Sequence, residues 1–167
     1  MKKFVVITAL ILTLFKIPAY SQMVKKGDQV PAATLKTITG KQFNLESVIG
    51  KKVVVVWVTD YCDVCRRGID NFIEASSQFS RENISFLLLS ATTENIAKKM
   101  NKYYNLGFTT LVAAEDPFTV ALTGEEHPGV CPVNNLFIID KSGKLSYRVH
   151  LPGITTRDLV KLIENVQ

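Results

Sequence analysis

Three cysteines are the residues of this 167-residue chain whose types and spacing point most directly to chemistry. Cys62 and Cys65 form a CxxC pair, and such thiols can exchange with disulfides or bind a soft metal ion. Cys131 is left over, because three cysteines cannot pair completely. It is interpreted as a small buried hydrophobe, as a third redox thiol, or as a soft metal ligand beside the pair.

The CxxC pair lies between a predicted strand and a predicted helix. Residues 53–58, VVVVWV, form an unbroken apolar run that is typical of a strand buried on both faces. Apolar residues then recur at helical spacing from Ile69 to Phe79, which predicts a helix over about residues 63–80. The unpaired N–H groups of a helix start favour a thiolate. We therefore expect Cys62 to attack a substrate disulfide and Cys65 to release the product.

A structural disulfide and half of a zinc site are the other interpretations of this pair. A structural zinc ion needs about four ligands, and the chain offers only one more cysteine and two histidines, His127 and His150. Both histidines are interpreted as exposed surface residues. A redox dithiol is therefore favoured, and neither a metal site nor a cofactor is expected.

The rest of the chain predicts the elements that must position this pair. A turn at residues 39–41 indicates a hairpin over residues 35–45, after an irregular lead-in at 22–33. Further strands are predicted at 84–89, 110–113, 136–139 and 144–150, and further helices at about 93–104, from 117, and at 159–166. Parallel crossovers followed by a C-terminal hairpin indicate an α/β fold, a mixed sheet with helices on both faces.

Local signals also predict how the helices begin and end. Thr92 or Thr93 is expected to cap the second helix, and Gly107 to mark its exit. Pro117 is expected to open a short third helix. Thr155 and Asp158 resemble a capping box before the last helix. Residues 123–133 are expected to form a loop.

Residues 1–21 are predicted to be a secretory signal peptide. Lys2 and Lys3 precede an apolar run at residues 4–15 that is too short to span a bilayer, and Ala19 and Ser21 are the small residues that precede a cleavage site. An uncleaved membrane anchor is the alternative. Cleavage would leave residues 22–167 as one domain without a membrane span. The protein is then expected to be periplasmic or secreted, where thiols can be oxidised.

Composition and charge exclude two other classes of protein. The chain is 47% hydrophobic and 21% charged, which excludes a disordered tail. Its net charge of +5 includes three lysines of the leader, and the other basic residues occur in scattered pairs rather than in a stripe. A nucleic-acid partner is therefore not expected.

Four segments together resemble the thioredoxin-like redoxin family. They are GKQFNL at 40–45, GKKVVVVW at 50–57, YCDVCR at 61–66 and FIIDKSGK at 137–144. The similarity is greatest to exported thiol-disulfide oxidoreductases of the cytochrome c maturation type. It implies a thioredoxin-like mixed sheet flanked by helices, with an N-terminal β-hairpin extension. It also implies partner proteins with thiols or disulfides, and a membrane electron donor.

The resemblance also implies a substrate-binding loop opposite the CxxC, usually with a cis-proline. An ungapped count back from Asp140 places Asn134 in that position, whereas the proline of this chain is Pro132. Either the loop carries two extra residues and Pro132 is the cis-proline, or the proline is lost. If Pro132 holds the position, Cys131 lies close to Cys62. Tyr61, Cys131, Pro132 and Asn134 are the predicted substrate-binding residues.

Two competing functions share this fold. A thiol peroxidase is suggested by Thr59, three residues before Cys62, but Val55 replaces the proline of that pattern and Asn134 replaces its arginine. A copper chaperone is suggested by YCDVC, with Cys62, Cys65 and either His127 or Cys131 as soft ligands. The cysteine pair of those chaperones is one residue wider, which makes copper binding the second choice and peroxidase activity the third.

Overall fold

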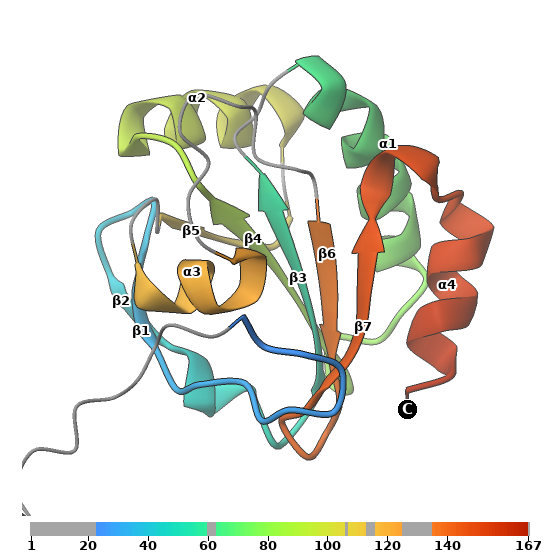
Figure 1. Cartoon of the computed structure of the whole chain (residues 1–167). Coiled ribbons are helices and arrows are strands. Elements are labelled where there is room, and N and C mark those ends of the chain that lie inside the picture. The colour runs from blue at the N-terminus through green and yellow to red at the C-terminus, as the bar shows by residue number, and fades with distance from the viewer. Residues whose placement is uncertain (1–22, 60–62, 106, 113–115, 125–134, 167) are drawn as a thin grey trace, which may run out of the picture.

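The structure, a computed structural model, describes residues 23–59, 63–105, 107–112, 116–124 and 135–166 (Figure 1). Within these ranges the side chains of residues 57–59, 63–67 and 152 are also not described. The predicted leader, residues 1–21, lies outside the described part of the chain. None of the described helices is both long enough and apolar enough to cross a membrane.

The chain forms one seven-stranded sheet with helices on both faces (Figure 1). The strand order is β2-β1-β5-β4-β3-β6-β7. The strands are β1 (Thr34–Thr37), β2 (Gln42–Asn44), β3 (Val53–Thr59), β4 (Ile84–Ser90), β5 (Thr109–Val112), β6 (Asn135–Ile139) and β7 (Leu145–His150). The helices are α1 (Asp63–Ser77), α2 (Glu94–Tyr104), α3 (Pro117–Thr123) and α4 (Thr156–Glu164), with short 3₁₀ helices η1 (Leu45–Ser47) and η2 (Leu151–Gly153).

The sheet is mixed, as the sequence predicts. β3 pairs in parallel with β4, and β4 with β5, whereas β6 pairs antiparallel with both β3 and β7. The N-terminal hairpin β1–β2 extends the sheet beyond β5 through antiparallel pairing. β3 therefore lies between β4 and β6, well inside the sheet. Because it is parallel to β4 and β5, the carboxyl ends of these three strands share one edge, which we call the carboxyl edge.

The four valines that begin β3 explain the two layers of the core. Val53 and Val55 point to one face and Val54 and Val56 to the other, and all four are fully buried. The first face, here the helical face, is covered by buried residues of α1, α2 and α4. The second, here the segment face, is covered by α3, η1 and the irregular segment 23–33, with α3 in front of the sheet in Figure 1.

The irregular segment is tied to the segment face by backbone hydrogen bonds rather than by helical packing. Five such bonds join it to α3, to η1 and to the turn and strand of the C-terminal hairpin. They run from Val24 N to Ala121 O (2.8 Å), Gly27 N to Leu145 O (2.8 Å), Val30 N to Gly143 O (3.0 Å), Leu145 N to Asp28 O (3.0 Å) and Leu45 N to Ala33 O (2.9 Å). The predicted lead-in is thus irregular, but it is part of the domain.

Two predicted helix boundaries, the end of α1 and the start of α4, are wrong, each for a local reason. α1 ends at Ser77 instead of residue 80, where the Ser76 and Ser77 hydroxyls donate to carbonyls of the preceding turn. α2 ends at Tyr104, as the sequence predicts, but its C-cap is Asn105, which adopts the left-handed conformation (φ 48°), rather than Gly107. α4 begins at Thr156 because Thr155 caps it by accepting from the Asp158 N–H at 3.2 Å.

Candidate functional site

The predicted strand and helix on either side of the CxxC pair are both present. β3 ends at Thr59, and α1 begins at Asp63 and runs for 15 residues. Cys65 is the third residue of α1, so its backbone belongs to the first helical turn. Cys62 lies outside the described residues, directly before Asp63 in the sequence. The N–H groups of that turn have no partner within the helix and present a partial positive charge.

The carboxyl edge also receives the chain where it returns from the predicted substrate-binding loop. β6 is antiparallel to β3, and its first residue, Asn135, pairs with Val58. Tyr61, Cys131, Pro132 and Asn134 lie outside the described residues, as does His127. The chain therefore resumes after these residues at a position beside the end of β3.

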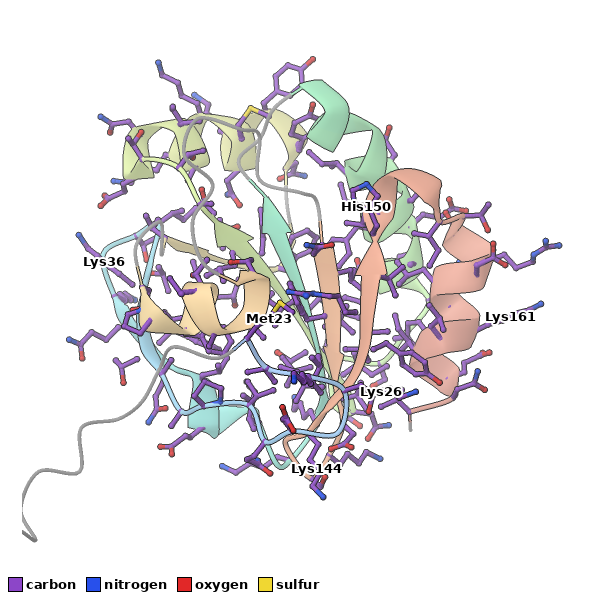
Figure 2. All side chains as sticks on the ribbon, in the orientation of Figure 1. Met23, Lys26, Lys36, Lys144, His150 and Lys161 are labelled. Carbon is purple, nitrogen blue, oxygen red and sulfur yellow. The ribbon has the colours of Figure 1, made fainter. Side chains whose placement is uncertain are left out.

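His150 is the one histidine that the described part of the chain contains. It ends β7, pairs with Asn135 and is exposed, as the sequence predicts (Figure 2). Its strand lies two places from β3 in the sheet. Within the described ranges, no three His, Cys, Asp or Glu side chains gather closely enough to hold a metal ion. The copper ligands named above are Cys62, Cys65 and either His127 or Cys131, none of whose side chains is described.

A buried hydroxyl lies on the neighbouring strand at the same edge. Ser90, fully buried at the end of β4, pairs in register with Thr59. Its hydroxyl lies 3.0 Å from the Thr92 hydroxyl and accepts from the Thr92 N–H at 3.3 Å. These bonds satisfy polar groups that would otherwise be buried without a partner. They also fix the path of the chain as it leaves β4 beside β3.

Contacts along its length hold α1 against η2 and the start of α4. Asn71 Nδ2 donates to Ile154 O at 3.1 Å, and Thr156 Oγ1 donates to Glu74 Oε2 at 2.8 Å. Gly68 is buried against Leu151, and a Cβ built at Gly68 would lie 3.4 Å from the Leu151 Cβ. One turn further along α1, the buried Phe72 ring packs on the helical face of the sheet, where it meets the Phe86 ring of β4. The helix that begins at the CxxC is therefore anchored by four separate side-chain contacts.

Sequence reasoning missed η2 and the Asn71 bond. A short 3₁₀ helix leaves no periodic signal, and Leu151-Pro152-Gly153 resembles an ordinary exit from a strand. The apolar Leu151 before Pro152 was the only available clue that this segment packs on α1.

Solved structures with the same fold include both disulfide oxidoreductases and peroxidoxins. A thiol:disulfide interchange protein of the thioredoxin family from Chlorobium tepidum TLS is 20% identical, with a TM-score of 0.66, covering 85% of this chain and 97% of that chain. A secreted Mycobacterium tuberculosis disulfide oxidoreductase homologous to E. coli DsbE is 18% identical, with a TM-score of 0.65 and coverages of 80% and 95%. Peroxidoxin BcpB from M. tuberculosis is 16% identical, with a TM-score of 0.72 and coverages of 86% and 99%.

These likenesses confirm the thioredoxin-like fold, and at these identities they show the fold alone. No curated protein matches the chain. The model of the AhpC/TSA family matches residues 26–148, which include β1 to β6, α1 and the CxxC pair. The chain therefore belongs to the AhpC/TSA family and is a thioredoxin-like redoxin.

Proposed function

We propose that this redoxin is an exported thiol-disulfide oxidoreductase that uses Cys62 and Cys65 as its redox dithiol. The observation that carries the proposal is the place of Cys65 in the first turn of a 15-residue helix, directly after an interior strand. A helix start favours the thiolate, which is the nucleophile of disulfide exchange. Membership of the AhpC/TSA family and the oxidoreductases among the solved structures with this fold support it.

In the reducing direction, the reaction proceeds by two exchanges. The Cys62 thiolate attacks one sulfur of the partner disulfide, forms a mixed disulfide, and releases the other partner sulfur as a thiolate. Cys65 then attacks the Cys62 sulfur, which closes the Cys62–Cys65 disulfide and releases the second partner thiolate. The partner gains two electrons, and the dithiol loses them. A dithiol donor in the membrane returns them to the oxidised enzyme.

The partner segment is proposed to bind against Tyr61 and the loop that carries Cys131, Pro132 and Asn134. The support is topological, because the chain enters β6 beside the strand that leads to Cys62. A segment held there would contact residues from both sides of the dithiol. The protein would act after removal of residues 1–21, in the periplasm or outside the cell.

The reductase activity is tested with residues 22–167 in an insulin-reduction assay supplied with dithiothreitol. We expect turnover by the parent, loss to the uncatalysed rate in Cys62→Ser, and retained turnover in the control Lys51→Gln, an exposed residue outside the proposed site. Cys65→Ser should accumulate the mixed disulfide, which non-reducing electrophoresis with mass spectrometry detects. Full activity of Cys62→Ser would refute the proposal. Equilibration in glutathione buffers then gives the potential and the net direction.

The family assignment makes a peroxidase the candidate to exclude. Thr59, at the end of β3, stands three residues before Cys62, as it does in the peroxidase pattern. A peroxidase would consume hydrogen peroxide with the same dithiothreitol supply, and Cys62→Ser would stop it. Peroxide consumption without insulin reduction would assign the site to peroxide chemistry. Tight Cu(I) binding that is lost in His127→Ala, without either activity, would assign it to copper delivery.

A further inference from the structure

The outer face of α2 is the most exposed apolar helix surface in the described part of the chain. Three large apolar or aromatic residues of the described chain are exposed, namely Tyr103 at 72%, Ile96 at 44% and Met23 at 39%. Two of the three belong to α2 and lie seven residues apart. Residues seven apart lie on the same side of a helix. Half-buried Met100 lies between them, so an apolar stripe follows the helix for two turns.

The opposite side of α2 already accounts for its role in the fold. Ala97 is fully buried and Tyr104 packs against the core of the helical face, while half-buried Met100 lies at the border between the two sides. Asn101 accepts from the Thr110 hydroxyl at 2.9 Å, which ties the helix to β5. The stripe therefore adds exposed apolar surface beyond what holds the helix in place. Tyr103 stacks edge-on against Tyr104, with ring centroids 4.8 Å apart, so that its exposed ring is held by its neighbour.

The charges beside the stripe are positive. α2 carries Lys98, Lys99 and Lys102 against one carboxylate, Glu94. Hydrogen bonds from Lys98 and then Lys36 lower the pKa of Glu94, so it stays ionised at neutral pH. It lies 3.1 Å from Lys36 and 2.5 Å from Lys98. Lys99 and Lys102 are exposed, and no ion pair is found for either within the described residues.

We propose that this surface, Ile96, Lys99, Met100, Lys102 and Tyr103, binds the anionic headgroups of a lipid bilayer. An apolar stripe flanked by lysines is the pattern of a helix that lies in the membrane interface. Tyrosine suits that interface because its ring is apolar and its hydroxyl is polar. Lysines on flexible stems can follow mobile phosphates. A stable protein interface needs about 800 Å² on each partner, and three apolar side chains on one helix offer much less.

The position of α2 gives this binding a consequence for the redox site. α2 follows β4, and its first turn therefore lies at the carboxyl edge, where β3 leads to the CxxC. A molecule bound through α2 would keep that edge near the membrane surface, where the proposed electron donor resides. Confinement there raises the effective concentration of the donor. The lipid proposal goes beyond the proposed function and does not depend on it.

The test uses residues 22–167, because both core clusters lie within residues 24–163. Binding is measured by co-sedimentation with vesicles of phosphatidylcholine, with and without phosphatidylglycerol. We expect binding to the anionic vesicles only, weakened by salt. Each lysine near an anionic surface is worth about fivefold in partitioning, so Lys99→Gln with Lys102→Gln should lose on the order of tenfold or more. The matched control, Lys41→Gln with Lys51→Gln, removes the same charge elsewhere. It should bind the anionic vesicles at least several-fold more tightly than the variant that lacks Lys99 and Lys102.

The apolar stripe is tested separately. Tyr103→Ser and Ile96→Ser should each weaken binding severalfold, with helix content checked by circular dichroism. Brominated lipid should quench the fluorescence of Tyr103→Trp more strongly than that of the parent. Equal losses in the control lysine pair, or no binding to anionic vesicles, would overturn the proposal. The proposal would also be overturned if Lys99 and Lys102 bound an acidic peptide while the protein did not bind vesicles. Cys62→Ser should bind vesicles like the parent, which separates this result from the redox test.

Discussion

The helical face of the sheet is covered by α1, α2 and α4, whereas the segment face is covered by the seven-residue α3, η1 and the irregular segment 23–33. On the helical face, side chains at helical spacing interlock with the sheet. On the segment face, backbone hydrogen bonds and turns hold a chain with no regular structure of its own. The same strands thus support two layers built by different means. The helix that begins at the CxxC belongs to the layer with helical packing.

The segment face also carries an exposed arginine whose guanidinium is partly covered by its neighbours. Arg148 donates to the Leu122 carbonyl at the end of α3 and to the Met23 sulfur, and it lies over the Phe137 ring with 5.2 Å to its centroid. Burial lowers the pKa of this guanidinium from its usual value. Arg148 therefore joins the irregular segment, α3 and the sheet through one side chain. On the helical face the elements are joined by apolar packing together with the hydrogen bonds of Asn71 and Thr156.

The largest effect should come from breaking the packing of the helical face. Phe72 is fully buried, and its ring meets those of Phe108 at 5.0 Å and Phe86 at 5.7 Å, both edge-on. Phe72→Ala should lower the free energy of unfolding by about 3–5 kcal/mol, because it leaves a cavity and removes these ring contacts. Urea denaturation measures this loss. Phe72→Leu, which fills most of the space, should recover a large part of the lost free energy of unfolding. A loss below about 1 kcal/mol in Phe72→Ala would contradict the assigned packing.

The next effect should come from the turn that supports the segment face. Gly143 has φ +82°, and a Cβ there would lie 2.4 Å from Gln29 Nε2 and 3.0 Å from Ile49 Cγ2. Gly143→Ala should cost about 2 kcal/mol, from the left-handed backbone and the displaced neighbours. Adding Gln29→Ala should recover only part of the loss, because it relieves the nearer contact but not the backbone strain. Full recovery would show that the backbone strain is negligible.

The two faces were not equally predictable from the sequence. The run VVVVWV and the spacing of Ile69 and Phe72 predict a buried strand and a helix that packs on it, and both are confirmed. The lead-in is predicted as irregular, and it is, but nothing in its residues shows that Val24 and Val30 are buried. Their partners, Ala121 and Gly143, are about a hundred residues away, and no local pattern encodes such backbone bonds.

The candidate site was likewise predictable from the sequence only in part. The sequence placed the CxxC between a strand and a helix start, and the bounds of β3 and α1 confirm that context. The parts that depend on contacts distant in sequence were not predictable, namely the packing of Gly68 on Leu151 and the bond from Asn71 to Ile154. The roles of Tyr61, Cys131, Pro132 and Asn134 stay predictions, since these residues lie outside the described ranges.

A smaller effect should appear when the segment face is probed with pH. Burial raises the pKa of Asp140, but hydrogen bonds from Ser142, Lys144 and Ser146 outweigh it, so the pKa lies below its usual value. The carboxylate therefore stabilises the fold at neutral pH, and this contribution is lost as the pH falls through the folded-state pKa. Because the group is largely solvated, the effect is at most about 1 kcal/mol.

Asp140→Asn separates this charge from the rest of the acid response. The amide oxygen can still accept from the Ser142 and Lys144 N–H groups, at 2.8 and 3.0 Å in the parent, but it does not titrate. We expect the parent to be more stable at pH 7 and the difference to shrink below about pH 4. Urea denaturation across this range measures it. A difference that stays constant with pH would contradict the assigned role of the charge.

The smallest effect should be a gain in stability on the helical face. Gly68 lies inside α1, and the Cβ of Gly68→Ala would meet Leu151 Cβ at 3.4 Å, an ordinary contact. Alanine in a helix interior is favoured over glycine by about 0.5–1 kcal/mol, so Gly68→Ala should unfold at higher urea concentration. Gly68→Val is the control, because its branches would press on Leu151 and remove the gain. Opposite signs for Gly68→Ala and Gly143→Ala would show that a methyl group stabilises a helix with room beside it and destabilises a left-handed turn against a crowded segment.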